Sequence, residues 1–336
     1  MNNLCVIKYG RNNKRLRYLC KSCFKSFSID FSHNKLSPIK LASLYLDGIP
    51  LRKLANQFNI SPMTVFRKCN AFLKKLPLNL NITTQYCNMS NFSGKLVFDG
   101  TYISVKGYKH QIPMIWAIDY DTHDIPHFML VPSENYLACK SFFATLKAIG
   151  YPLKYLVSDD NNNIKLAAAD IFPNALIQTC WTHYLNNIRA DLNIRSSFKY
   201  FHFFSEIENV FKSRLCEVEL MWKVQAIYPT FCNDKKCLDW LTDLMHKRKQ
   251  LTNYHMFENC PNTTNLIEVY NSHLKQRLKA IKGFQSYHSA HSWLNAYVIK
   301  RRLKSFTDCN TKFKHLNGHC SLEKTIKKSL KLPNIF

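Results

Sequence analysis

The order of strand and helix patterns between residues 94 and 180 constrains the fold of this chain more than any other feature. Three strand-like segments of alternating apolar residues come first, at about residues 95–105, 112–119 and 125–131. A helical pattern ending at Gly150, a short apolar strand, a second helical pattern and a fifth strand follow. This order predicts an α/β domain in which helices cover both faces of a mixed sheet.

Two aspartates lie where this arrangement brings neighbouring strands together. The order is that of the ribonuclease-H-like fold, in which Asp99 lies inside the first strand and Asp159 directly after the neighbouring fourth. An Asp among the apolar residues of "LVFDGTY" is costly to bury alone, and a hard cation such as Mg²⁺ between paired carboxylates explains it best. A turn or edge Asp bonded to the backbone is the alternative. It suits Asp119, Asp121 and Asp160 better than Asp99.

A third acid comes from a helix further along the chain. In "NTTNLIEVYNSHLKQRLKAI" the apolar residues recur at helical spacing, and Glu268 lies in the first turn. Lys275, seven residues later, lies on the same face, where it can hold a DNA phosphate. The alternatives are a capping box of Asn265 and Glu268, and a solvated lysine at position 275.

The net charge of +25 is unevenly distributed along the 336 residues. Residues 1–90 contain 15 Lys and Arg against 2 Asp and Glu, and residues 269–336 contain 14 against 2. Residues 91–268 contain 18 of each kind. A neutral core between two basic arms favours a polyanion as partner, nucleic acid before a membrane surface. A lysine-rich solvated surface is the alternative.

The cysteines and the hydropathy indicate a soluble protein in a reducing compartment. The 13 cysteines are scattered and odd in number, and no signal peptide opens the sequence. No apolar run approaches the ~18–20 residues that a membrane span requires. We therefore expect a cytoplasmic, nucleoid-associated protein without a membrane partner.

The first 30 residues contain half of a zinc-ribbon pattern. The segment "YGRNNKRLRYLCKSCFKSFS" alternates basic and apolar residues, and Cys20 and Cys23 form a Cys-x-x-Cys knuckle in it. A structural zinc takes four ligands, usually from two such knuckles, and only Cys5 precedes this one. We expect a truncated, ribbon-like hairpin at residues 1–30 and leave zinc binding by Cys20 and Cys23 open.

Residues 35–77 carry the pattern of a helix-turn-helix. One helix is followed by two short amphipathic helices on either side of a tight turn at residues 59–61. The last helix would contact the DNA major groove and phosphates with Thr64, Arg67 and Lys68. A three-helix bundle without a DNA role is the alternative. Residues 77–91, polar and rich in Asn and Thr, are expected to form a linker.

The segment "QTCWTHYLNNI", at the end of the fifth strand, contains a Cys-x-x-His pair, Cys180 and His183. A zinc site would require two further ligands, and no cysteine or histidine downstream stands at a spacing that identifies them. Two buried residues without a role are a second interpretation. We favour a third, in which Cys180 packs at the end of the strand and His183 lies beside the acids.

These residues together make the sequence resemble the Mutator-like superfamily of DDE transposases, in particular its bacterial insertion-sequence branch. The three acidic motifs of the superfamily are matched by "FDGTY", "VSDDNN" and "TTNLIEVYNSHLK", which carry Asp99, Asp159 and Glu268. Its Cys-x-x-His signature after the fifth strand is matched by Cys180 and His183. The usual Gly after the second Asp is Asp160 here, which leaves the choice between Asp159 and Asp160 open.

The resemblance covers about residues 94–300, with a basic tail at residues 301–336 behind it. Such enzymes have a helical insertion before the Glu helix, and residues 186–262, with helical spacing around Trp222 and Trp240, fit that role. The ribbon-like hairpin and the helix-turn-helix resemble the DNA-binding head that is common in insertion-sequence transposases.

The resemblance also implies a mechanism. The three acids would hold two Mg²⁺ or Mn²⁺ ions on either side of a scissile phosphate, for strand cleavage and strand transfer without a covalent enzyme intermediate. His183 would orient a phosphate or the nucleophile, assisted by Asn186 or Arg189. The partners would be the terminal repeats of the element and the target DNA, and the enzyme would act as a homo-oligomer.

Two other functions stay open at this point. A DNA-binding protein descended from a transposase would keep the fold without cleaving DNA, and the intact acids argue against it. A nuclease of the same fold would cleave without joining. The helical insertion and the two-part DNA-binding head favour the transposase.

Overall fold

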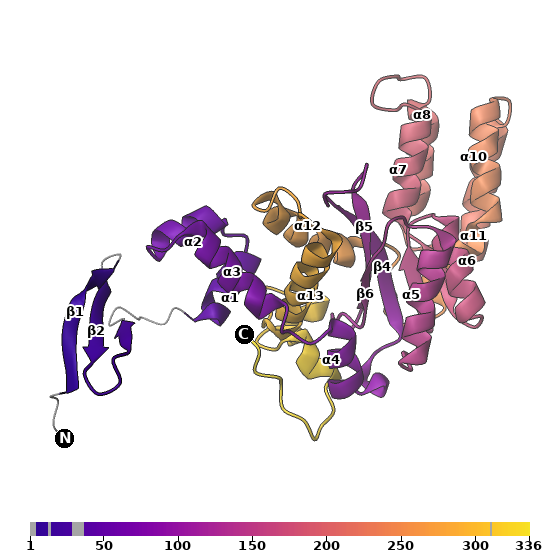
Figure 1. Ribbon diagram of the computed structural model, residues 1–336. Helices are drawn as coiled ribbons and strands as arrows, with labels where there is room; N and C mark the ends of the chain where they lie inside the picture. The colour runs from indigo at the N-terminus through magenta and orange to yellow at the C-terminus, as the bar shows by residue number, and fades with distance from the viewer. Residues whose placement is uncertain (1–4, 13–14, 29–36, 310) are drawn as a thin grey trace.

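The computed structural model describes residues 5–12, 15–28, 37–309 and 311–336. At its centre lies a five-stranded mixed sheet with the strand order β6-β5-β4-β7-β8 (Figure 1). The strands are β4 (Lys95–Ile103), β5 (Ile112–Asp119), β6 (Phe128–Leu130), β7 (Tyr155–Ser158) and β8 (Leu176–Thr179). β4 pairs antiparallel with β5 and parallel with β7, and β7 pairs parallel with β8. The mixed sheet expected from the sequence is confirmed.

The alternation of side chains along β4 and β5 builds a core on each face of this sheet. Four helices cover the two faces, α5 (Tyr136–Ala148), α6 (Asn162–Ile171), α12 (Asn265–Lys279) and α13 (Tyr287–Leu303). Leu96 and Phe98 share one core with α5 and α6, whereas Val97 and Trp116 share the other with α12 and α13. Figure 1 shows the sheet between these two pairs of helices.

A run of helices occupies the segment between β8 and α12, where the sequence predicts a helical insertion. It consists of α7 (Trp181–Asp191), α8 (Phe201–Phe211), α9 (Glu217–Phe231), α10 (Lys235–His246), α11 (Arg248–Thr252) and the 3-10 helix η3 (Asn253–His255). The buried amide of Gln178 donates to the Leu251 carbonyl at 3.0 Å and accepts from the Tyr254 N–H at 3.0 Å, which ties the insertion to β8. No helix in the described ranges, here or elsewhere, has the length and apolar character for crossing a membrane.

The N-terminal strands form a second, three-stranded antiparallel sheet. They are β1 (Val6–Asn12), β2 (Arg15–Cys20) and β3 (Ser26–Ser28). Cys20 ends β2, and Cys23 lies in the turn that leads to β3. Within the described part of the chain, no group of three possible metal ligands includes either cysteine. Zinc binding therefore rests on the cysteine pair alone.

Three helices follow, in the order expected of a helix-turn-helix. They are α1 (Pro38–Leu46), α2 (Leu51–Gln57) and α3 (Pro62–Leu73). Their small core consists of Leu41, Leu54, Ala55, Val65 and Cys69. Between α2 and α3 the chain turns at Asn59, whose φ of 49° is a left-handed conformation that Asn tolerates. Ser61 then caps α3 by accepting the Thr64 N–H at 3.1 Å.

The expected linker and the expected basic tail both contain helices. Within residues 77–91, Asn79–Tyr86 forms helix α4, and after α13 the chain forms η4 (Thr311–Leu316) and α14 (Ser321–Thr325). α4, α13 and α14 meet at a buried ion pair of Arg302, which donates to both carboxylate oxygens of Asp124 at 2.7 Å. Thr325 also donates to Asp124, at 2.6 Å, and Thr83 accepts from Arg302 at 2.8 Å. These polar partners hold the segments against the body, a long-range effect that local composition does not show.

Candidate active site

Asp99 lies in β4 and presents its carboxylate at the surface of the sheet. Its Oδ1 accepts the Gly100 N–H at 2.8 Å, and its Oδ2 accepts the side-chain amide of Asn271 at 2.7 Å. Asn271 is itself held in place, because its Oδ1 accepts the Trp116 indole N–H at 2.9 Å. The pKa of Asp99 is raised to about 6, chiefly by burial and also by the charges of Asp159 and Glu268, against the lowering effects of the Gly100 N–H and His183.

The register between β4 and β7 brings Asp159 to Asp99. The two strands run parallel, and Val97 pairs with Val157. Each acid stands two residues beyond this pair, so both lie at the same edge of neighbouring strands about 4.8 Å apart. Burial raises the pKa of Asp159 as well, although the Asn161 N–H and the charge of His183 lower it.

Asp160 belongs to a different set of contacts. Lys165 and Lys247 both form ion pairs with its carboxylate, the second at 2.6 Å. Lys247 also pairs with Asp243 of α10 at 2.8 Å, which joins the loop after β7 to the helical insertion. Two cations thus neutralise Asp160, whereas Asp159 lies among acids. This geometry favours Asp159 as the second acid of the site.

Glu268 brings the third acid on the first turn of α12. The N-cap of this helix is Thr264 rather than Asn265, so Glu268 does not occupy the capping-box position that was the alternative interpretation. The Thr264 hydroxyl donates to Glu268 Oε1 at 2.8 Å, and His183 Nε2 lies 3.8 Å from the same oxygen. Glu268 is therefore oriented toward the site from its own N-cap.

Cys180 and His183 lie at the start of α7, facing Thr264. The Thr264 N–H donates to Cys180 Sγ at 3.3 Å, and its hydroxyl lies 3.2 Å from this sulfur and 3.4 Å from His183 Nδ1. The hydrogen bond with Cys180 raises the pKa of His183 to about 9, and the charges of Asp99 and Glu268 act in the same direction. The fully buried Cys180 thus links the starts of α7 and α12, while His183 lies beside the acids.

Cys180, His183 and Glu268 also form the one group of possible metal ligands found in the described residues. Their ligand atoms all lie within 4.8 Å of one another. No fourth His, Cys, Asp or Glu of the described chain joins them, so a closed tetrahedral zinc site is not formed.

Two residues of the site escaped the sequence analysis. Glu134, in the loop before α5, reaches over β4, and a Cβ at Gly100 would lie 2.9 Å from its Oε2. Burial first, then the charges of Asp159 and Asp99, raise the pKa of Glu134 to about 7. No motif marks Glu134. Asn271 is three residues after Glu268 on the same helix face, and that spacing is a signal that could have identified it.

The residues proposed to assist His183 lie elsewhere. Arg189 donates to Asn186 at 2.6 Å and to Glu208 of α8 at 2.8 Å. Its guanidinium also stacks over the Phe204 ring, 4.9 Å from the ring centroid. Because Arg189 is already engaged by the insertion, the expectation that Asn186 or Arg189 assists at the acids is not supported by their contacts.

The four residues predicted to bind DNA are placed on two helices. On α3, Arg67 is exposed and Lys68 half-buried, while the Thr64 hydroxyl is bonded to Ser61 at 2.9 Å and so helps to start the helix. Lys275 is exposed on α12, where it lines a groove with Lys279 and Lys282 that begins at Tyr102 of β4. Arg67, Lys68 and Lys275 are therefore accessible to a polyanion.

The donor set of the site fits a divalent cation. Asp99, Asp159 and Glu134 all have raised pKa values, for which burial is the largest cause and the neighbouring charges a further one. Buried carboxylates that repel one another favour either a proton or a cation between them. Hard carboxylate oxygens suit Mg²⁺, and the charge of His183 lowers the pKa of both Asp99 and Asp159.

One known protein family matches the part of the chain that contains these acids. A family model described as "Transposase, Mutator family" matches residues 39–304. The matched range includes α1 to α3, the central sheet, the insertion and α13, and all the acids described above lie within it. No curated protein matches the chain. Since the model covers most of its length, the chain belongs to the Mutator family of transposases.

Proposed function

We propose that this transposase cleaves and joins DNA strands at a DDE site made of Asp99, Asp159 and Glu268. The observation that carries the proposal is the convergence of Asp99 and Asp159 at one edge of β4 and β7. Glu268 reaches the same place from a distant segment through α12, and its charge raises the pKa of Asp99. The strand order of the sheet supports a ribonuclease-H-like arrangement for the domain.

The metals of this proposal are two Mg²⁺ or Mn²⁺ ions held by the three acids. When bound, such ions activate water or a 3′-hydroxyl for attack on a phosphate and stabilise the leaving oxygen. The carboxylates would release their protons on binding them, because the raised pKa of Asp99 reflects an unmet demand for positive charge.

The surrounding residues have positioning roles in this proposal. The Gly100 N–H and Asn271 each bond one oxygen of Asp99, and Thr264 bonds one oxygen of Glu268. Because an ionised carboxylate has about four lone-pair sites, both acids keep acceptor capacity for the site. The Nε2 of His183 is directed at the acids and can donate to a DNA phosphate, while its Nδ1 lies beside the Thr264 hydroxyl. Helix α7, whose N-cap is Cys180, sets the orientation of the His183 side chain.

DNA binding in this proposal uses the basic arms. Arg67 and Lys68 of α3 contact the terminal repeats, and Lys275 contacts a phosphate near the acids. The exposed Met63 and Phe66 on the same helix provide apolar surface for base methyl groups. We expect this chain to act on DNA in the nucleoid as a homo-oligomer.

The test is strand cleavage and joining with labelled terminal-repeat DNA and Mg²⁺. The wild-type chain should cut and join, and Asp99→Asn should bind the DNA but not cut it. Asp239→Asn, which removes an exposed carboxylate on α10, is the matched control and should remain active. Binding without cleavage by the wild type would indicate a DNA-binding descendant of a transposase. Cleavage without joining would indicate a nuclease.

A further inference from the structure

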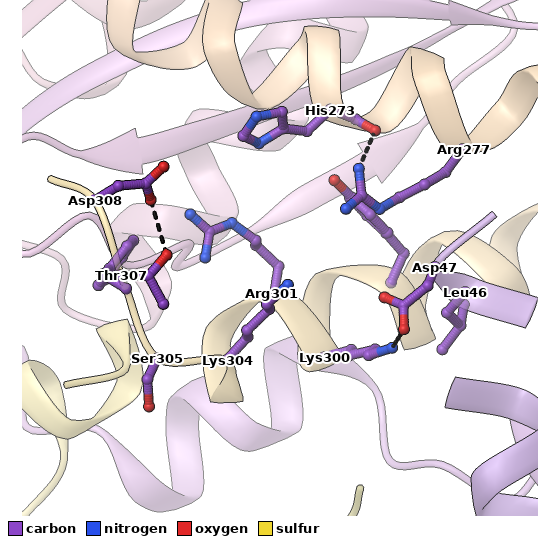
Figure 2. A pocket seen from close by; sticks show the side chains of 12 residues that line it. Leu46, Asp47, His273, Arg277, Lys300, Arg301, Lys304, Ser305, Thr307 and Asp308 are labelled. Carbon is purple, nitrogen blue, oxygen red and sulfur yellow. Dashed lines mark hydrogen bonds and ion pairs between the residues drawn. The ribbon is translucent and has the colours of Figure 1, made fainter. Parts of the chain in front are cut away.

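A pocket of about 130 Å³ lies where α1, α12 and α13 meet (Figure 2). His273 and Arg277 of α12, Lys300 and Arg301 of α13, and the segment that follows α13 line it. The volume is below the ~300–1,000 Å³ of pockets for organic ligands and equals roughly four times the share of one water in the liquid, ~30 Å³. The pocket has room for a small anion such as a phosphate group.

The charges around this α1–α12–α13 pocket are predominantly positive. Lys300 is neutralised, because its Nζ contacts Asp47 Oδ2 at 2.7 Å and the Ser43 carbonyl at 2.7 Å. The other acid on the lining, Asp308, is exposed at the rim. Three further cations line the pocket, and none of them forms an ion pair with a carboxylate in the described parts of the chain; these are Arg277, Arg301 and Lys304.

The guanidinium of Arg301 is fixed in the pocket by aromatic rings rather than by an acid. It lies 4.5 Å from the ring centroid of Tyr270 and 4.8 Å from that of Phe306. Stacking leaves the edge of the guanidinium, with its N–H donors, directed away from the rings. Figure 2 shows the Arg301 guanidinium on the side of Thr307 and Asp308, and the Arg277 guanidinium beside the His273 carbonyl.

Arg277 is held in a similar way. Its Nη1 donates to the His273 carbonyl at 2.7 Å, and its guanidinium lies 6.0 Å from the centre of the Tyr297 ring. Burial first, then the charges of Arg277 and Arg301, lower the pKa of His273, and the opposing charge of Asp308 does not outweigh them. A guanidinium that is held in place and has no carboxylate partner is well suited to form bidentate hydrogen bonds to a phosphate.

We propose that the α1–α12–α13 pocket binds one backbone phosphate of duplex DNA, through Arg277, Arg301 and Lys304. The proposal rests on the function proposed above and adds a specific contact to it. The pocket joins the helix bundle to the helix that carries Glu268, since α1 and α12 both line it. Arg277 is nine residues after Glu268, which at ~1.5 Å and ~3.6 residues per turn is about 14 Å along the axis of α12 and roughly two and a half turns, on the opposite side of the helix from Glu268.

One bound phosphate predicts a defined salt dependence. The affinity for a fluorescent duplex is measured across a range of salt concentrations, and the logarithm of the binding constant is plotted against that of the salt concentration. Arg301→Gln should weaken binding about tenfold at low salt and reduce the slope by about 0.9. Adding Arg277→Gln should reduce the slope no further, because both side chains serve the same phosphate. The loss should be equal for terminal-repeat and random sequences.

Matched variants separate binding from folding. Lys304→Gln removes an exposed pocket lysine that makes no stacking contact and should also reduce the slope. Lys154→Gln removes an exposed lysine before β7, at the opposite end of that strand from Asp159, and should leave the slope unchanged. Arg301→Lys keeps the charge and should restore the slope, with weaker affinity than wild type. Thermal unfolding of each variant is measured in parallel.

The outcomes bear on different claims. A wild-type chain that binds no duplex would overturn the proposed function and the phosphate pocket with it. A wild type that binds, with Arg301→Gln and Lys304→Gln both retaining its slope, would overturn the pocket alone. Protection of the wild type against thermal unfolding by inorganic phosphate, together with unchanged duplex binding in these variants, would assign the pocket to a free anion and likewise reject the proposal.

Discussion

Asp99 lies in β4 of the central sheet and Asp124 lies in the loop between β5 and β6, and their surroundings shift the two carboxylate pKa values in opposite directions. At Asp124, which is fully buried, the ion pair with Arg302 and the Thr325 hydrogen bond outweigh burial and hold the pKa below its usual range. At Asp99, burial and the neighbouring acids raise the pKa to about 6. The first charge is compensated by a buried ion pair, whereas the second lies among acids, and the charge of His183 offsets them only in part.

Two histidines repeat the contrast. His183, beside the acids and bonded to Cys180, has its pKa raised to about 9. Burial among aromatic rings lowers the pKa of His123 to about 4, and its Nε2 is buried without a hydrogen-bond partner in the described structure. Around Asp124 the chain therefore selects the charge states that suit a packed interior. At the acids it maintains charge repulsion, which costs stability and is typical of a functional site.

The contrast between an aspartate among acids and an aspartate paired with cations is tested most directly at Asp159 and Asp160, by replacing each with asparagine. Asp159→Asn should lower strand cleavage at least ~10³-fold, about 4 kcal/mol of transition-state stabilisation, without lowering the free energy of unfolding. Asp160→Asn should leave cleavage within ~10-fold but destabilise the fold by about 1–3 kcal/mol, because Lys165 and Lys247 lose their partner. The reverse pattern would identify Asp160 as the site acid.

The region around Asp124 should lose stability when the cation of its ion pair, Arg302, is removed. Arg302→Met leaves Asp124 buried without a partner and should lower the free energy of unfolding by about 3–5 kcal/mol, measured by urea denaturation. Arg195→Met, a matched change at an exposed arginine of the insertion, should alter it by less than ~0.5 kcal/mol. Equal effects of the two variants would contradict the role assigned to the ion pair.

The stability contributed by the buried His123 should also depend on pH. The unfolded chain protonates histidine near pH 6.5, whereas folded His123 resists protonation down to about pH 4. The unfolded state therefore binds more protons between these values. The contribution of His123 to the free energy of unfolding is fully present above pH 6.5 and declines by up to about 3 kcal/mol toward pH 4. His123→Asn, which suits the positive φ of 56°, should make this decline shallower in urea titrations. A decline identical to wild type would exclude His123 as its source.

The smallest effect is expected where a neutral side chain supports the acids. Thr264→Val removes the hydroxyl that orients Glu268 and should slow cleavage about five- to tenfold, equivalent to ~1 kcal/mol, while the fold is retained. Thr263→Val alters the neighbouring residue, for which no side-chain hydrogen bond occurs in the described structure, and serves as the control. If both variants cleave like wild type, Thr264 does not position Glu268.

Much of the sheet could be predicted because its signals are local. The alternation in "KLVFDGTYISV" defines both faces of β4, and the apolar run before Asp159 defines β7. Once these two strands are parallel neighbours, Asp99 and Asp159 must meet. The start of α4 in the expected linker was not predictable in this way, because Asn79 is buried through bonds to Asn295 and Arg302, more than 200 residues away.

The candidate site was predictable in part, for the same reason. Glu268 stands in a helix with a strong apolar period, and Asn271 follows on its face. Glu134 lies in a loop without periodicity, and only the approach of that loop to Gly100 brings it to the acids. Arg189 was assigned to the acids from its position after His183, but Glu208 and Phe204 of α8 engage it.

The sequence by itself determined the order of strands and helices and the family, and it supplied the three acids of the proposed site, because these depend on short-range periodicity and on motifs a few residues long. Only the tertiary structure decided which charges stay uncompensated. Asp159 and Asp160 are adjacent in the chain, yet Lys247 pairs with Asp160 because the insertion folds back against β8 and brings Lys247 to the loop after β7. A charge is paired or exposed according to contacts between distant segments, and folding alone sets those distances.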